Sequence, residues 1–308
     1  MYEKNIIVFG ECMVELSGSP LSKRFGGDTL NTALYLTRIL QNHPFTIRYA
    51  TGLGNDMHSS SLIDAWQAEG IRCDLVATID GKQPGLYIVE TDANGERSFH
   101  YWRSDSAAKY YFEQHSPLEQ AVEQQTIDMF YLSGISLAIL SHTARDKLLA
   151  TIAKMKTNNT IIVFDNNYRE ALWSADEAKL WYEKVLKYTD IALITEEDDY
   201  AVWGDQEIIQ RCTDFGCQQV VIKRGGHPCT LVENLQSQQT LTNVAPIKVE
   251  KVVDTCSAGD AFAAGYLSGY LTGQSAQQRL NLAHQTAATV IQYPGAITPK
   301  SAITPLEI

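Results

Sequence analysis

Short apolar runs alternate with longer segments of helical period along most of this 308-residue chain. Segments at 29–40, 142–155 and 176–188 space their apolar residues by three and four, as helices do. Strands that read as continuous apolar runs are typically buried on both faces of a parallel sheet. The alternation predicts an α/β fold, with a doubly wound, mostly parallel sheet flanked by helices. The expected strands are NIIVF (5–9), MFYL (129–132), TIIVF (160–164), DIALI (190–194) and QVVIK (219–223).

Residues 74–103 break this rhythm and alternate apolar with polar side chains instead. Within them, Asn94-Gly95 carries the turn signal of a β-hairpin. We expect this segment and residues 11–17 to form a small β-sheet inserted into a single α/β domain spanning residues 1–308. Inserted sheets of this kind commonly act as lids that exclude water from a cleft.

The net charge of −11 repels nucleic acid and anionic membranes over most of the surface, so neither is an expected partner. An anionic substrate must therefore be held by a few local cations. The six cysteines include no CxxC pair, which favours free thiols over a disulfide or zinc site. No signal-peptide core or membrane-spanning run is apparent, and a cytoplasmic location is expected.

The stretch VVDTCSAGDAFAAGY (252–266) joins a strand end to a helix through small residues. Free N–H groups at a helix N-terminus bind anions, and small side chains let an anion approach the backbone. A carboxylate there, Asp260, would weaken anion binding unless it removes a proton from an attacking hydroxyl. The alternative is that Asp260 only caps the helix. No Walker A motif is present, so a nucleotide would need another binding device.

The stretch DTCSAGDAFAAGY resembles the DTxGAGD signature of the ribokinase-like carbohydrate kinases. FGGDTLNTA (25–33) resembles the sugar-binding GG-x-x-x-N signature of the same family, in the expected order. The resemblance covers essentially the whole chain and implies a ribokinase-like fold. Segments such as PGLYIVETDANGERSFHYWR and FDNNYR are most similar to members that phosphorylate 2-keto-3-deoxygluconate with ATP.

The resemblance implies that Asp260 is the general base and that an anion hole for the transferred phosphoryl group comes from Ser257, Ala258 and Gly259. Serine stands at 257 where the family has glycine, so a positive φ there would be strained. A sugar acid also needs a guanidinium for its carboxylate. The alternative interpretation is that Tyr87 and Tyr101 are only cross-strand partners in a hairpin and that Arg103 is a solvated charge. The expected substrate-binding residues are Gly27, Asp28, Asn31, Tyr87, Tyr101, Arg103 and Arg169.

The nucleotide side matches the family less closely, because Pro228 stands where a second glycine is expected. The expected MgATP-binding residues are Asn167, Lys223, Gly225, Gly226 and His284. The magnesium-linked NxxE motif falls at 195–198, where Thr195 and Asp198 replace its end residues, and Asp198 would recruit the metal through water. A monovalent cation such as potassium would sit near Asp254 and residues 292–297.

Alternatives to a 2-keto-3-deoxygluconate kinase are a kinase for fructose, ribose or another keto-deoxy sugar acid, and a catalytically silent sugar-acid sensor. The substitutions at Ser257, Thr195 and Asp198 favour the sensor, and Asp260 favours an enzyme. The open edges of the small sheet predict a homodimer through the lid, or a higher homo-oligomer.

Overall fold

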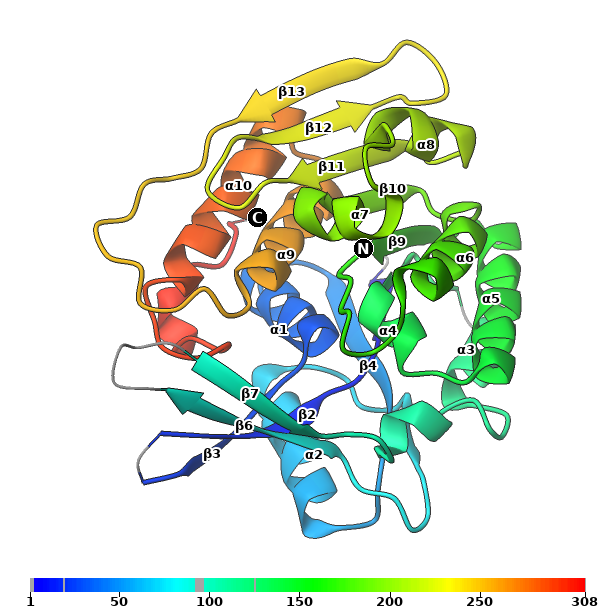
Figure 1. Cartoon of the computed structure of the whole chain (residues 1–308), viewed down its shortest axis with the longest axis vertical. Helices are drawn as coiled ribbons and strands as arrows, with labels where there is room; N and C mark the ends of the chain where they lie inside the picture. Colours follow the sequence, from blue (N-terminus) through cyan, green and yellow to red (C-terminus); the bar gives the residue numbers. More distant parts are fainter. Residues whose placement is uncertain (1–2, 19, 92–96, 125, 308) are drawn as a thin grey trace.

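A computed structural model of the chain describes residues 3–18, 20–91, 97–124 and 126–307. Figure 1 shows a large sheet covered by helices on both faces, with a small sheet beside it. The helices are α1 (Asp28–Ile39), α2 (Met57–Glu69), α3 (Pro117–Gln124), α4 (Gly134–Ala138), α5 (His142–Thr157), α6 (Ala175–Leu186), α7 (Glu196–Trp203), α8 (Ile208–Asp214), α9 (Ala258–Leu271) and α10 (Ala276–Val290). The described residues also form two short 3-10 helices, at Ala107–Tyr110 and Lys300–Ala302.

The large sheet has nine strands in the order β13-β12-β11-β10-β9-β8-β1-β4-β5. Pairing is parallel from β5 to β11 and antiparallel from β11 to β13. The predicted mostly parallel, doubly wound sheet is therefore confirmed. The strands are β1 (Lys4–Phe9), β4 (Phe45–Leu53), β5 (Val76–Thr78), β8 (Met129–Ser133), β9 (Ile161–Asp165), β10 (Ile191–Thr195), β11 (Gln219–Lys223), β12 (Cys229–Glu233) and β13 (Thr240–Val244).

The apolar runs of the central strands are buried on both faces because alternate residues enter different cores. Ile7 and Phe9 of β1 join the cluster formed with α3 to α8. Ile6 and Val8 join the cluster formed with α1, α2, α9 and α10. Successive side chains of a strand point to opposite faces, so a strand covered by helices on both sides needs an unbroken apolar run.

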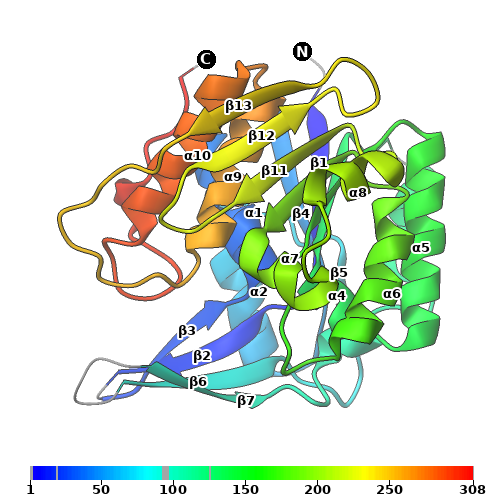
Figure 2. The same cartoon turned by 45° about the horizontal axis from the view of Figure 1, so that its top comes forward.

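The small sheet has four strands in the order β3-β2-β6-β7. They are β2 (Met13–Ser17), β3 (Ser22–Gly26), β6 (Gly85–Thr91) and β7 (Arg97–Trp102). Figure 2 shows this sheet standing away from the large one. The expected lid segment 74–103 is too long, because Val76–Thr78 pairs with β4 of the large sheet instead. The expected Asn94-Gly95 turn lies outside the described residues.

The parallel strands of the large sheet end at the same edge, and polar residues lie at or just beyond the ends of five of them. They are Glu11 after β1, Ser133 of β8, Asp165 of β9, Thr195 of β10 and Lys223 of β11. Ligands of open α/β sheets bind at this carboxyl edge. None of the helices in the described part of the chain has the length and apolar character needed to cross a bilayer.

Candidate active site

A cavity of about 600 Å³ lies at the carboxyl edge of the large sheet. Its walls come from the strand ends, from the N-terminal turns of α1 and α9, and from the small sheet. Almost all of the predicted site residues line this cavity. A hollow of about 790 Å³ adjoins it and shares Tyr101 and Arg103 with it.

Asp260 lies in the first turn of α9, directly after the small residues that open the helix. Its Oδ2 accepts a hydrogen bond from the Asn31 side-chain amide at 2.9 Å, which joins α9 to α1. Ser257 precedes the helix in the left-handed conformation, with φ 64°. The position thus has the positive φ that glycine adopts without strain. A Cβ placed on Gly259 would meet no heavy atom within 4 Å, so the backbone there is open to the cavity.

Burial raises the pKa of Asp260 to about 7, and the nearby carboxylates of Asp28 and Asp165 add to this rise. The amide of Asn31 and the ammonium of Lys223 oppose the rise. A carboxyl group with this pKa is partly protonated near neutral pH and can both take up and release a proton there. This is the property that a general base requires.

The N-terminal turn of α1 faces α9 across the cavity. Asp28 receives a 2.7 Å hydrogen bond from the Asn167 side chain at its Oδ2, and burial raises the pKa of the Asp28 carboxyl. A Cβ on Gly27 would lie 2.2 Å from the backbone oxygen of Glu11, so only glycine fits at this close approach. Gly27, Asp28 and Asn31 all line the cavity, as the sequence predicts.

Aromatic side chains of the small sheet form the opposite wall of the cavity. Tyr87 and Tyr101 are direct cross-strand partners, with ring centroids 5.8 Å apart, and both line the cavity. The two interpretations made from the sequence are therefore compatible. The Tyr87 hydroxyl donates to Glu15 Oε2 at 2.5 Å, and burial raises the pKa of Tyr87 far above its ordinary value.

Arg103 is not a solvated charge. Its guanidinium forms an ion pair with the buried Glu11, and the Arg103 side chain itself is only 13% exposed. Arg169, in contrast, is half exposed: its Nη1 donates to the backbone oxygen of Tyr168 at 2.6 Å and lies 3.4 Å from Asp198 Oδ2. Burial raises the pKa of Asp198, and Arg169 partly offsets that rise. Both arginines line the cavity.

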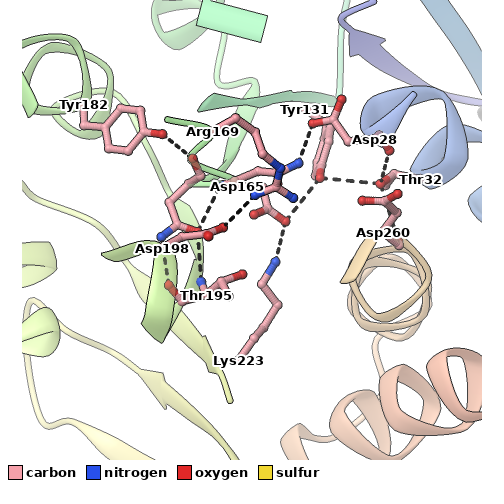
Figure 3. A network of polar contacts seen from close by, with 12 residues as sticks. Asp28, Thr32, Tyr131, Asp165, Arg169, Tyr182, Thr195, Asp198, Lys223 and Asp260 are labelled. Atoms are coloured by element: carbon pink, nitrogen blue, oxygen red, sulfur yellow. Dashed lines mark hydrogen bonds and ion pairs between the residues drawn. The ribbon is translucent and has the colours of Figure 1, made fainter. Parts of the chain in front are cut away.

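Figure 3 shows the polar network between the strand ends and the two helices. Lys223 donates to Asp165 Oδ2 at 2.7 Å, and the Tyr131 hydroxyl donates to the same oxygen at 3.4 Å. Thr32 contacts both the Tyr131 hydroxyl and the backbone oxygen of Asp260, at 3.5 and 3.4 Å. Hydrogen bonds thus link β11, β9, β8, α1 and α9.

Three predicted nucleotide-side residues are not among those lining the cavity: Gly225, Gly226 and His284. His284 is buried, with its Nε2 3.1 Å from Cys229 Sγ and 3.2 Å from the backbone oxygen of Val244. Gly225 has φ 53°, which fits the turn expected from its sequence. Asn167 and Lys223 do line the cavity.

Glu11 and Asp165 line the cavity but were not predicted as site residues. Each lies where a buried apolar run ends, and the carboxyl edge of a parallel sheet is where polar residues meet ligands. Their position at the end of a predicted strand was the sequence signal that could have identified them as site residues. Their partners, Arg103 and Lys223, are distant in sequence, so the pairing itself left no local pattern.

Carboxylates outnumber cations around the cavity. Among the described residues, six acidic side chains line it, against the three cations Arg103, Arg169 and Lys223. Two of those cations are already paired with buried carboxylates. No group of three or more His, Cys, Asp or Glu side chains in the described ranges could hold a metal ion. The acidic side chains are Glu11, Asp28, Asp165, Glu197, Asp198 and Asp260.

The pfkB family of carbohydrate kinases matches residues 3–303, and the chain belongs to this family. A 2-dehydro-3-deoxygluconokinase of Dickeya dadantii is 47% identical over 313 residues, which cover 98% of this chain and 99% of that protein. One from Escherichia coli strain K12 is 44% identical over 308 residues, which cover 97% and 99%. A crystal structure of 2-dehydro-3-deoxygluconokinase from Thermotoga maritima has a TM-score of 0.82 at 20% identity, covering 96% of this chain and 95% of that one. That likeness concerns the fold.

Proposed function

We propose that this protein is a kinase that transfers the γ-phosphoryl group of ATP to 2-keto-3-deoxygluconate, also called 2-dehydro-3-deoxygluconate. The observation that carries the proposal is Asp260, a carboxyl group with a pKa raised to about 7 at the open N-terminus of α9. The relatives that are 47% and 44% identical over nearly the whole chain support the choice of substrate.

In the proposed reaction, Asp260 takes the proton of the terminal hydroxyl as its oxygen attacks the γ-phosphorus in line. The new bond joins that oxygen to phosphorus, the bond to the ADP oxygen breaks, and the product is the 6-phosphate. Backbone N–H groups of Ser257, Ala258 and Gly259 stabilise the charge on the transferred group. The small residues at this helix end support the role, because they leave the backbone accessible.

On the sugar side, Arg103 and Arg169 hold the carboxylate, because a guanidinium can grip it through two parallel hydrogen bonds. Gly27, Asp28 and Asn31 bind hydroxyl groups. Tyr87 and Tyr101 reach in from the small sheet, which acts as a lid over the bound sugar. The support for this assignment is that all of these residues line one cavity.

On the nucleotide side, ATP binds with magnesium, and Asn167, Lys223, Gly225 and Gly226 form its site, whereas His284 packs in the core and is not part of it. Asp198 would bind the magnesium ion through water, because the described residues offer no group of three or more His, Cys, Asp or Glu side chains that could hold a metal ion directly. The excess of carboxylates supports a need for added cations when two anionic substrates bind. A monovalent cation near Asp254 and residues 292–297 would supply a further charge.

The protein pairs with a second copy through its lids. Strand β7 is at the end of the small sheet, and Trp102 on it is 59% exposed. An open strand edge beside a large exposed aromatic side chain is a ready surface for a second chain. Sedimentation of the purified protein tests this assignment, and a monomer at micromolar concentration contradicts it.

Coupled ATP turnover with a panel of sugars tests the activity. The panel contains 2-keto-3-deoxygluconate, its galactonate epimer, fructose and ribose. We expect the highest kcat/KM with 2-keto-3-deoxygluconate, and Arg103→Ala should weaken the sugar acid far more than fructose. Faster turnover of fructose or ribose contradicts the substrate, and no ATP turnover with any of the sugars favours a sensor.

A further inference from the structure

The ion pair between Asp165 and Lys223 is buried in the wall of the cavity. Its nitrogen and oxygen are 2.7 Å apart, and the two side chains are only 5% and 10% exposed. Taking both charges out of water costs more free energy than most buried pairs return, so such a pair is weak evidence of a stabilising role. Its position at the ends of β9 and β11, beside Asp260 in the same cavity, points to a role in the chemistry instead.

Only one of the two oxygens of the Asp165 carboxylate accepts hydrogen bonds from the described residues. Its Oδ2 accepts from Lys223 and, at 3.4 Å, from the Tyr131 hydroxyl. Its Oδ1 is buried and has no hydrogen-bond partner within the described ranges. Buried polar atoms are nearly always paired in proteins, and an exception calls for an explanation, of which a catalytic role is one. Among the described residues, Lys223 is the one cation that forms an ion pair with the Asp165 carboxylate.

This pair belongs to the set of ionisable groups around Asp260. Figure 3 shows Lys223 pointing from β11 toward Asp165, with Asp260 and Asp28 farther along the same network. Helix α10, packed along α9, places His284 against Phe262 instead. The titratable groups whose charges interact with that of Asp260 are Asp28 and Tyr35 on α1, Tyr131 on β8, Asp165 on β9 and Lys223 on β11.

We infer that Asp165 is a positioning residue: it fixes the Lys223 ammonium in the cavity wall, and the two charges together set the pH above which Asp260 acts as a base. The inference rests on the proposed kinase function, adds Asp165 to it and gives Lys223 a second role through Asp260. The opposite effects of the two charges on the pKa of Asp260 agree with this geometry, since Asp165 raises it and Lys223 lowers it.

The two charges predict shifts of opposite sign. Asp165→Asn removes a negative charge and leaves Lys223 to stabilise ionised Asp260, so the acidic limb of the pH profile moves to lower pH. Lys223→Met removes the positive charge, so the limb moves to higher pH. Each shift should be about one pH unit, the lower end of what a neighbouring charge produces. Lys223→Arg keeps the charge and should restore the limb to its wild-type position.

The experiment is the pH dependence of kcat/KM for 2-keto-3-deoxygluconate at saturating MgATP, for wild type and each variant in the same buffers. The titration of ATP itself is common to all samples, so it does not affect the difference between a variant and wild type. Asp190→Asn is the matched control, because Asp190 pairs with Lys156 at the same 2.7 Å but does not line the cavity. We expect its acidic limb to coincide with that of wild type.

Limbs that move in the same direction, or do not move, overturn the inference, since a purely structural pair would lower turnover without shifting the profile. Where Asp165→Asn does not fold, Lys223→Met and Lys223→Arg decide, and a limb that stays in place in Lys223→Met is then the contradicting result. If wild type turns over the sugar acid but the variants show no shift of the acidic limb, the inference is refuted and the proposed function stands. Wild type without turnover refutes the proposed function as well.

Discussion

Ser257 occupies a backbone conformation that costs free energy, and Ser257→Gly should remove that cost. Its φ of 64° lies in the left-handed region, where an L-residue other than glycine loses about 1–2 kcal/mol. Its Oγ is also buried without a hydrogen-bond partner among the described residues. Glycine also lowers the free energy of unfolding by about 0.4–1 kcal/mol, because it gives the unfolded chain more conformational freedom. The net expectation is a gain of about 1 kcal/mol, or about 2 °C in Tm for a chain of this size.

Urea unfolding of wild type, Ser257→Gly and Ser257→Ala measures this gain. Alanine removes the unpaired hydroxyl but keeps the Cβ, so its gain should be smaller than that of glycine. Turnover by Ser257→Gly should stay within about twofold of wild type, because the backbone N–H groups keep their positions. A glycine variant less stable than wild type, or less stable than the alanine variant, refutes the strain argument.

Four further outcomes are expected. The kcat/KM of wild type should rise with pH and level off above about 7, because Asp260 must lose its proton to act as a base; a rate independent of pH through this range contradicts the role. The contribution of Asp260 to folding should become less favourable as pH rises from about 4 through 7, since its pKa is raised above its ordinary value on folding; urea unfolding of Asp260→Asn should therefore show a larger gain over wild type at pH 8 than at pH 5. Gly27→Ala should raise the sugar KM at least tenfold, because its Cβ would lie 2.2 Å from a backbone oxygen, and an unchanged KM would mean that α1 moves freely. Arg211→Met should lower the free energy of unfolding by about 3 kcal/mol, because it leaves the buried Asp199 carboxylate unpaired, and a loss below 1 kcal/mol would contradict this.

The central strands were predictable because their burial leaves a local pattern. Strands 4–9, 129–133 and 161–165 are covered on both faces, so nearly every residue in them is apolar. Strands β4, β12 and β13 were not predicted, and in β4 the polar Arg48 and Thr51 interrupt the apolar run although both are buried. TLTNV of β13 lies at the edge of the sheet, where most of its residues meet solvent, and CTLVE of β12 is mostly buried but includes the polar Thr230.

The functional site was predictable where one motif supplies both the element and the chemistry. Asp260 and Asn31 each lie in the first turn of a helix, their sequence signatures predict one shared site, and a 2.9 Å hydrogen bond joins the two side chains. The pairing of Arg103 with Glu11 was not predictable, because it joins residues 92 positions apart and depends on where the small sheet lies relative to the carboxyl end of β1. His284 shows the converse: a polar residue on a late helix satisfies its ring nitrogen within the core.

The central claim is that Asp260 removes the proton from the acceptor hydroxyl. Rapid-quench single-turnover measurements with labelled ATP, on wild type and Asp260→Asn, isolate that chemical step from product release. We predict that Asp260→Asn slows phosphoryl transfer by at least a factor of about 1,000, while the Kd for the sugar acid stays within a few fold. A transfer rate within tenfold of wild type contradicts the claim.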